Sequence, residues 1–308
     1  MVALLIAAAL AAGPTTRPTT PSELRAACKL VAPAGGTIIL DRNIIGLAES
    51  LYIATLGDVT ILGTTGTAGL SWSWPWDGVR SEHNGLEISA RRIVINGIRL
   101  RNYQQPGAAL KLDPTESAIV SACTIDSCGT ARHPAYTLPA RSASDVPYTS
   151  GIAMHRGTAA SLMVSGCTWV NSCTQWRDWS HCLYADAGSV TVIGCTYVAS
   201  GNPWSWGPTG RQATVIGCRV LSTCHTRDRA GNETWPYLCD LPIGPDITLA
   251  GNTIAGTWVV MYTGHPSQAR QAIGPNDYSG AIVTEHWGAD TGRGEWLTRA
   301  QCEALGWR

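Results

Sequence analysis

"VIGCTYVASG" at residues 192–201 is one of four copies of a phrase in which valine lies three residues before a cysteine and a small residue lies directly before it. The other copies are "VSACTIDSC" (120–128), "VSGCTWVNSC" (164–173) and "VIGCRVLSTC" (215–224). Two divergent copies, "VINGIRLRN" (94–102) and "TLAGNTIAG" (248–256), carry Ile98 and Asn252 at the cysteine position. Successive copies lie 25, 44, 28, 23 and 34 residues apart. A unit of this size that accepts insertions is typical of a solenoid with loops on one face.

The apolar stretches within each copy alternate and are too short for helices. We therefore predict an all-β fold, a right-handed single-stranded parallel β-helix (solenoid) with short capping helices at its ends. Each coil of such a fold stacks about 4.8 Å above the last, so that equivalent residues form columns. The position before the cysteine holds only Gly or Ala, as expected where the backbone bends or lies very close to another segment of the chain.

The repeat also predicts where the cysteines lie in the fold. We expect Cys123, Cys167, Cys195 and Cys218 to stack inside the coil, and Cys128, Cys173 and Cys224 to form a shorter stack at the next corner. Buried cysteine packs as a small hydrophobe. Disulfides between adjacent coils are the alternative, and their pairing does not follow from the sequence. The chain has 11 cysteines, an odd number, so at least one has no partner within the chain.

Both ends of the chain carry helix signals. "TPSELRAACKLVAP" (20–33) has Thr20 as N-cap, Pro21 at the first helical position and Glu23 completing a capping box. "LTRAQCEALG" (297–306) repeats this pattern near the C-terminus. A helix at each end would cover the open end of the coil and its edge strands. We expect one domain over residues 14–308.

The first residues, "MVALLIAAALAAGP", form an apolar run followed by a Pro-rich spacer. The run is too short to span a bilayer and fits a signal peptide over residues 1–13, which predicts a secreted, extracellular or periplasmic protein. A buried N-terminal strand or helix is the alternative. The net charge is zero and charged residues are 14% of the chain, so no electrostatic patch recruits nucleic acid or a membrane. We expect a monomer.

The order of "AAGGTIIL", "DVTILG", "RRIVINGIRLRN", "AALKLDPTESAIVSACTI" and "SGIAMHRGTAASLMVSGCTW" resembles pectate lyases and related secreted right-handed β-helix proteins. The resemblance covers roughly residues 22–256 and implies a groove that holds an acidic polysaccharide, with Ca²⁺ as cofactor and an arginine as base. The calcium-binding carboxylates of those enzymes are not matched, since this chain has Gly107, Ala108, Ser150 and Met154 there. We therefore assign no metal ligands. For the arginine, "CHTRDRAGNETW" (224–235) offers Arg227 or Arg229.

The candidate groove strands are "LEIS" (86–89), "LKLD" (110–113), "IAMH" (152–155) and "LYAD" (183–186). Alternation predicts two outward columns, which we call ladder one and ladder two. Ladder one is Glu87, Lys111, Ala153 and Tyr184. Ladder two is Ser89, Asp113, His155 and Asp186. The cluster is either an active site or a solvated face with unrelated charges.

Elimination from a uronide needs a cation or donor for the carboxylate, a base and an acid. Lys111 is the candidate base, Arg156 or Arg229 the candidate cation, and His155 or Tyr184 the candidate acid. Hydrolysis needs two carboxylates instead, for which Asp113 and Asp186 are the candidates. The same two carboxylates with His155 offer weak ligands for a divalent ion.

Tryptophans are the other candidate binding residues. "SWSWPWDG" (71–78) places Trp72, Trp74 and Trp76 at alternate positions, and "NPWSWGP" (202–208) adds Trp204 and Trp206. Exposed indoles would stack on the apolar faces of sugar rings, whereas buried ones would pack inserted loops onto the coil. The leading hypothesis is a secreted carbohydrate-active enzyme, a polysaccharide lyase acting on a uronate-containing polymer. The alternatives are a non-catalytic glycan-binding or adhesive surface protein and a glycoside hydrolase.

Overall fold

The computed structural model describes residues 13–74, 83–130, 149–174, 180–207, 210–221, 226–227, 233–234, 237–241, 246–263, 271–273 and 276–282. Within these ranges the structure is mostly β-strand, and one helix is present, α2 (Pro21–Val31). The all-β class is therefore confirmed. The predicted helix over 297–306 and nearly all of the predicted signal peptide lie outside the described residues.

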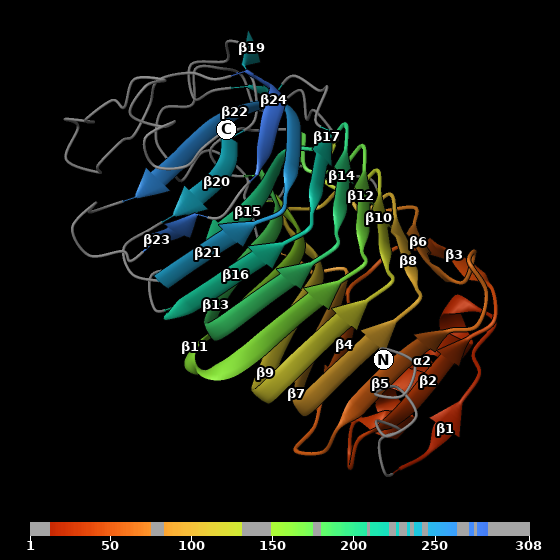
Figure 1. The fold of residues 1–308 in the computed structure, drawn as a ribbon. Coiled ribbons are helices and arrows are strands. Elements are labelled where there is room, and N and C mark those ends of the chain that lie inside the picture. The colour runs from red at the N-terminus through yellow and green to blue at the C-terminus, as the bar shows by residue number, and fades with distance from the viewer. Residues whose placement is uncertain are drawn as a thin grey trace, which may run out of the picture.

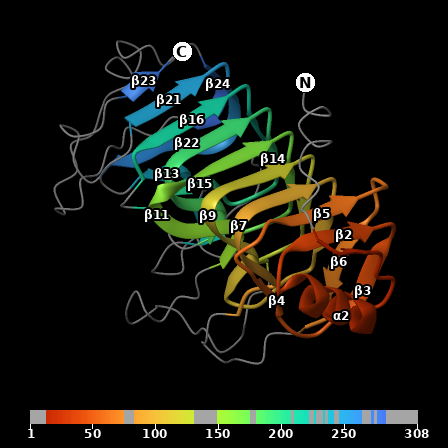
Figure 2. The ribbon, with the colours of Figure 1, turned by 90° about the horizontal axis from the view of Figure 1, so that it is seen from below.

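The strands form three parallel stacks (Figures 1 and 2), and four long strands contribute to both the first and the second. The first stack contains β4 (Leu51–Ala54), β7 (Leu86–Asn96), β9 (Gly107–Ser121), β11 (Thr149–Ser165), β13 (Ser180–Ile193), β15 (Asn202–Trp206) and β20 (Tyr237–Leu241). The second contains β1 (Thr15–Thr16), β2 (Gly36–Leu40), β5 (Val59–Gly63), the later halves of β7, β9, β11 and β13, then β16 (Gln212–Ile216), β21 (Asp246–Ala250) and β23 (Gln271–Ile273).

The third stack contains β3 (Asn43–Leu47), β6 (Gly69–Trp72), β8 (Arg99–Arg101), β10 (Thr124–Asp126), β12 (Thr168–Val170), β14 (Thr196–Val198), β17 (Arg219–Leu221), β22 (Thr253–Thr263) and β24 (Asp277–Ile282). The later part of β22 also pairs with β20 of the first stack. A separate antiparallel pair is made by β18 (Thr226–Arg227) and β19 (Glu233–Thr234).

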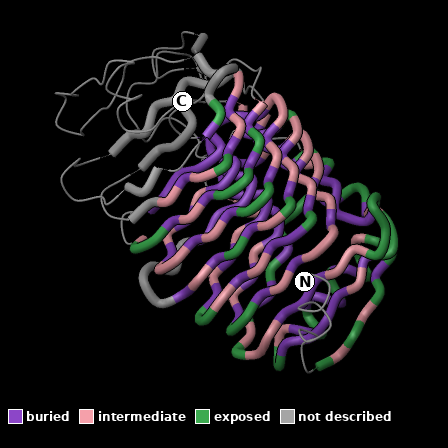
Figure 3. The backbone as a smooth tube through the Cα atoms, viewed as in Figure 1, coloured by how far each residue is buried: buried purple, intermediate pink, exposed green. Residues whose placement is uncertain are grey.

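The strand register follows the sequence repeat. In the third stack the paired residues are the apolar positions that follow each copy's cysteine, namely Leu100, Ile125, Trp169, Tyr197, Val220 and Ile254. Each of these side chains is buried, while its neighbours along the strand are partly or fully exposed (Figure 3). Alternation in each strand thus forms a continuous apolar core.

The four stacked cysteines occupy equivalent places. Each Sγ atom lies 3.2–3.6 Å from the carbonyl oxygen two residues before it in the chain. Each also lies 3.6–3.9 Å from a carbonyl oxygen of the preceding copy: Ile95, Val120, Val164 and Val192 for Cys123, Cys167, Cys195 and Cys218. All four are at most 2% exposed. The predicted inward stack is confirmed, and none of the eight cysteines whose side chains are described forms a disulfide.

The second predicted cysteine stack is wrong by one residue. The backbone N–H of Cys128 donates to Ser172 Oγ, and the N–H of Ser172 donates to Ser200 Oγ. Cys128 therefore stacks with two serines, and Cys173 lies one position later, where its N–H donates to the carbonyl of Cys128. Cys224 lies outside the described residues. Cysteine spacing alone misplaced Cys173, because serine fills the same small inward position.

The corner before the stacked cysteines needs glycine for its backbone angle. Gly97, Ala122, Gly166, Gly194, Gly217 and Gly251 have φ between 51° and 68°. A Cβ atom at Gly166, Gly194 or Gly217 would meet nothing within 4 Å. The expected close approach is therefore absent at these three positions, and the left-handed conformation explains the residue choice.

Gly166→Ala should consequently cost only the left-handed strain, about 1–2 kcal/mol. Gly201→Ala should cost considerably more, because its Cβ would lie 1.7 Å from the carbonyl oxygen of Cys173. Urea denaturation of both variants measures the difference in unfolding free energy. Equal losses would contradict this account of the corner.

Helix α2 lies at the N-terminal end of the stacks (Figure 2), where it contacts β2, β3 and β4. Its buried residues are Leu24, Ala27, Cys28 and Val31. Thr20 Oγ1 accepts a hydrogen bond from the N–H of Glu23, as predicted. The Glu23 carboxylate accepts from both the N–H and the hydroxyl of Thr19, so the capping box closes one residue earlier than expected. These bonds lower the pKa of Glu23. No helix of the described residues is long and apolar enough to cross a bilayer.

Thr20→Ala should destabilise the protein by about 1 kcal/mol, because an N–H of the first turn loses its acceptor. Thr20→Ser keeps the hydroxyl and should stay within a few tenths of a kcal/mol of the wild type. Chemical denaturation followed by circular dichroism measures both. A serine variant as unstable as the alanine variant would refute the capping role.

Candidate functional site

The first stack carries both predicted ladders. Leu86, Ile88, Leu110, Leu112, Ile152, Met154, Leu183 and Ala185 are buried, as expected for the inward positions. In ladder one, strand pairing joins Glu87 to Lys111, Lys111 to Ala153 and Ala153 to Tyr184. In ladder two, Ser89 pairs with Asp113, and His155 pairs with Asp186. Leu112 pairs with Met154, the residues directly before Asp113 and His155, and the register shifts after this pair.

Lys111 lies between two carboxylates. Its Nζ atom is 3.1 Å from Glu87 Oε1 and 3.8 Å from Asp113 Oδ2, and all three side chains are at least three-quarters buried. Asn84 Nδ2 donates to the other oxygen of Glu87 at 2.8 Å, and Asn84 Oδ1 accepts from the N–H of Ala108. Lys111 is thus held by ion pairs to two carboxylates from its own strand and the adjacent strand.

A column of polar side chains that the sequence analysis missed lies beside ladder one. Ser150 pairs with His181, and His181 pairs with Asn202. The His181 ring lies 6.3 Å from the ring of Tyr184, centroid to centroid. Ser150, His181 and Asn202 are each at most 3% exposed. His181 thus supplies an imidazole next to a ladder residue.

Strict alternation hid this column because the strands contain an irregularity at their start. A Cβ atom on Gly151 would contact the buried Trp169, although the next residue, Ile152, is itself fully buried. A Cβ atom on Gly85 would likewise contact the buried Trp72 and Tyr103, and the next residue, Leu86, is also buried. Because two successive residues both face inward, the residue before them and the residue after them, three positions apart, lie on the same side of the strand. The glycine before two of the four groove strands, at Gly85 and Gly151, was the available signal.

Several predicted site residues have side chains that the structure does not describe. His155 and Arg156 belong to β11, but only their backbone is described. Arg229 and Trp76 lie outside the described residues altogether. Their proposed roles therefore stay predictions.

Three of the predicted sugar-stacking tryptophans are core residues. Trp72, Trp204 and Trp206 are 2%, 0% and 1% exposed. Trp204 donates its Nε1–H to Tyr197 Oη at 2.8 Å, and Trp72 packs edge-on against Tyr103. Alternation puts Trp204 and Trp206 on one side of β15, but that side faces the core, so the expectation of an exposed aromatic surface is wrong for them.

Two other aromatic side chains remain accessible on this side of the molecule. Trp74 is partly exposed and lies 5.2 Å from the His83 ring, next to Asn84 in the chain. Tyr52 is 57% exposed and pairs with Glu87, so it extends ladder one by one residue. Ladder one therefore has a tyrosine at each end, Tyr52 and Tyr184, with the ion pair between them.

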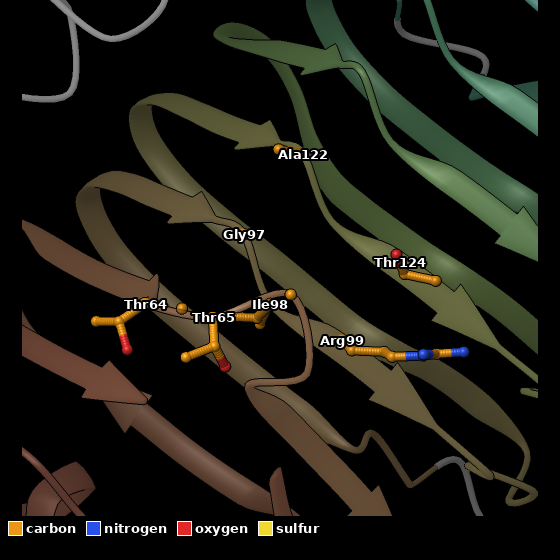
Figure 4. A pocket seen from close by; sticks show the side chains of 9 residues that line it. Thr64, Thr65, Gly97, Ile98, Arg99, Ala122 and Thr124 are labelled. Carbon is orange, nitrogen blue, oxygen red and sulfur yellow. The ribbon is translucent and has the colours of Figure 1, made fainter. Parts of the chain in front are cut away.

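A cavity of about 310 Å³ lies elsewhere, at the corner between the second and third stacks (Figure 4). It is lined by Gly63–Gly66, Gly97–Arg99, Ala122 and Thr124. Arg99 is bound to Asp126 at 2.5 Å, and Thr64 donates to Asp41. No predicted site residue lines it. Among the described residues no cluster of three metal-ligating side chains occurs, so they offer no calcium site to match the one that the resemblance implies.

Comparisons with known proteins add no further assignment. No protein-family model, curated protein or solved structure matches the chain.

Proposed function

We propose that the chain is a right-handed parallel β-helix similar to the pectate lyases, folded as one domain over residues 14–308 after an export signal. Three parallel stacks and a register that follows a repeat of 23–44 residues support this winding. Parallel strands joined by crossovers are right-handed in almost all proteins. Polysaccharide binding on the first stack is the corresponding proposal for function.

The first stack offers the chemistry that sugars need. Accessible Tyr52 and Trp74 provide aromatic surface for the apolar faces of sugar rings. The polar side chains of ladder one and ladder two provide hydrogen-bonding partners for hydroxyl groups. Polar groups next to partly exposed aromatic rings are a typical composition of ligand sites.

The position of Lys111 between Glu87 and Asp113 favours hydrolysis over elimination. An ammonium group held by two carboxylates is a poor base, so elimination would need Arg227 or Arg229 as the base instead. Hydrolysis needs two carboxyl groups, and Asp113 and Asp186 lie two strands apart in ladder two. That spacing is about 9.6 Å between their backbones. Inverting glycosidases hold their carboxyl groups roughly 6.5–9.5 Å apart, whereas retaining enzymes need about 5 Å. The inverting range is nearer to the strand spacing than the range of retaining enzymes is, so we favour an inverting glycoside hydrolase, with Tyr184 two residues before Asp186 on the same strand.

The test is incubation of the protein with neutral and uronate-containing polysaccharides, with and without Ca²⁺, scoring reducing ends and the ultraviolet absorbance of unsaturated ends separately. Hydrolysis predicts new reducing ends without absorbance, and inversion is visible by proton magnetic resonance. Absorbance would establish a lyase instead. Binding of a polysaccharide without new reducing or unsaturated ends would indicate a non-catalytic glycan-binding protein.

Asp113→Asn and Asp186→Asn should each lower kcat by roughly 100-fold or more, since each removes a proton-transferring group. Asp41→Asn is the matched control, because Asp41 is an exposed carboxylate near the N-terminal end. It should retain wild-type activity. Unchanged kcat in both ladder variants would refute the carboxylate pair.

The Lys111→Arg variant distinguishes a role of Lys111 as a fixed cation from a role as the base. Arginine keeps the charge near Glu87 and Asp113 but stays protonated in proteins. If Lys111 is a fixed cation, most of the activity should survive in Lys111→Arg and be lost in Lys111→Met. Loss of activity in a folded Lys111→Arg variant would restore the base role.

A further inference from the structure

The inward cysteine stack brings four thiols together on four consecutive coils. The backbone bonds that link these coils run from Thr168 to Cys123, from Thr196 to Cys167 and from Arg219 to Cys195, at 2.8–2.9 Å. The N–H of Cys123 also lies 3.5 Å from Cys167 Sγ. Neighbouring thiols are in direct hydrogen-bond contact, Cys167 with both Cys123 and Cys195, and Cys195 with Cys218.

This spacing suits covalent pairing. Adjacent parallel strands lie about 4.8 Å apart, and disulfides join residues whose Cα atoms are roughly 4.4–6.8 Å apart. A thiol can form a disulfide with only one neighbour. All four stacked thiols are therefore paired only when the first bonds to the second and the third bonds to the fourth. Pairing of the middle two would leave both end thiols without a neighbour.

We propose that Cys123–Cys167 and Cys195–Cys218 are latent disulfide sites that close when the chain folds with a disulfide oxidant such as oxidised glutathione. One cysteine thiolate attacks the oxidant's S–S bond and releases a glutathione thiol. The neighbouring cysteine then attacks the mixed disulfide and releases the second glutathione thiol. The oxidant gains two electrons and two protons, and one protein disulfide forms. This site is independent of the glycan chemistry.

Closure has to occur during folding. The four stacked thiols are at most 2% exposed. A thiol that an oxidant in solution cannot reach exchanges slowly. The folded, reduced protein should therefore resist glutathione, whereas the unfolded chain should react as its coils assemble.

The experiment refolds the full reduced chain with and without a mixture of oxidised and reduced glutathione. Free thiols are then alkylated and the digested peptides are analysed by mass spectrometry. Peptides joining 123 to 167 and 195 to 218 are expected only with oxidant, each about 2 Da lighter than the sum of its reduced parts. The oxidised protein should also melt at a higher temperature than the reduced one.

Cys167→Ser should remove only the first cross-link and leave Cys123 alkylated. The matched control Cys28→Ser changes a buried cysteine of α2 outside the stack and should keep both cross-links. Wild-type protein that melts cooperatively but has all four stack thiols alkylated would overturn the proposal. Cross-links that join these thiols to each other differently, or to any other cysteine, would overturn it as well.

Discussion

Backbone hydrogen bonding between successive parallel strands, in a register that follows the sequence repeat, is the constraint on which the other features depend. Each corner N–H donates to a carbonyl of a neighbouring coil, for example Gly166 to Ile193 and Gly194 to Ile216. These bonds require the corner residue to adopt a positive φ, which glycine does without strain. Once the corners align, equivalent side chains form columns, and the members of a column face the same way. Small, apolar or amide side chains therefore recur at fixed places.

The column that holds the cysteines illustrates this selection. It continues with Asn252, whose Oδ1 accepts from the N–H of Cys218 at 2.8 Å, and then with Asn276, whose Oδ1 accepts from the N–H of Asn252. A buried amide is tolerated here because a backbone donor on the adjacent coil satisfies it. Cysteine needs no such partner and fills the same space as a small hydrophobe. A position in this column therefore does not itself require a reactive thiol, so only oxidation distinguishes a reactive cysteine here from one that merely fills space.

The polar surface of the first stack depends on the same register and on one departure from it. Register alone brings Glu87, Lys111 and Asp113 together, although Glu87 and Lys111 are 24 residues apart in the chain. The irregular start of the strands then adds His181 beside Tyr184. Lys111 is held between two carboxylates in this group, and this contact is why hydrolysis is proposed in preference to elimination.

The sequence by itself determined the repeat, the columns and the N-terminal helix, because alternation, corner glycines and capping residues act over a few neighbouring positions. It correctly predicted the pairing of Glu87 with Lys111 and of His155 with Asp186. Only the tertiary structure decided which side of β15 faces inward, and so buried Trp204 and Trp206. It also decided that Cys173 leaves its column and that the buried His181 lies beside Tyr184. The physical reason is that alternation acts between neighbouring residues, whereas the burial of a strand face depends on packing against segments far away in the chain.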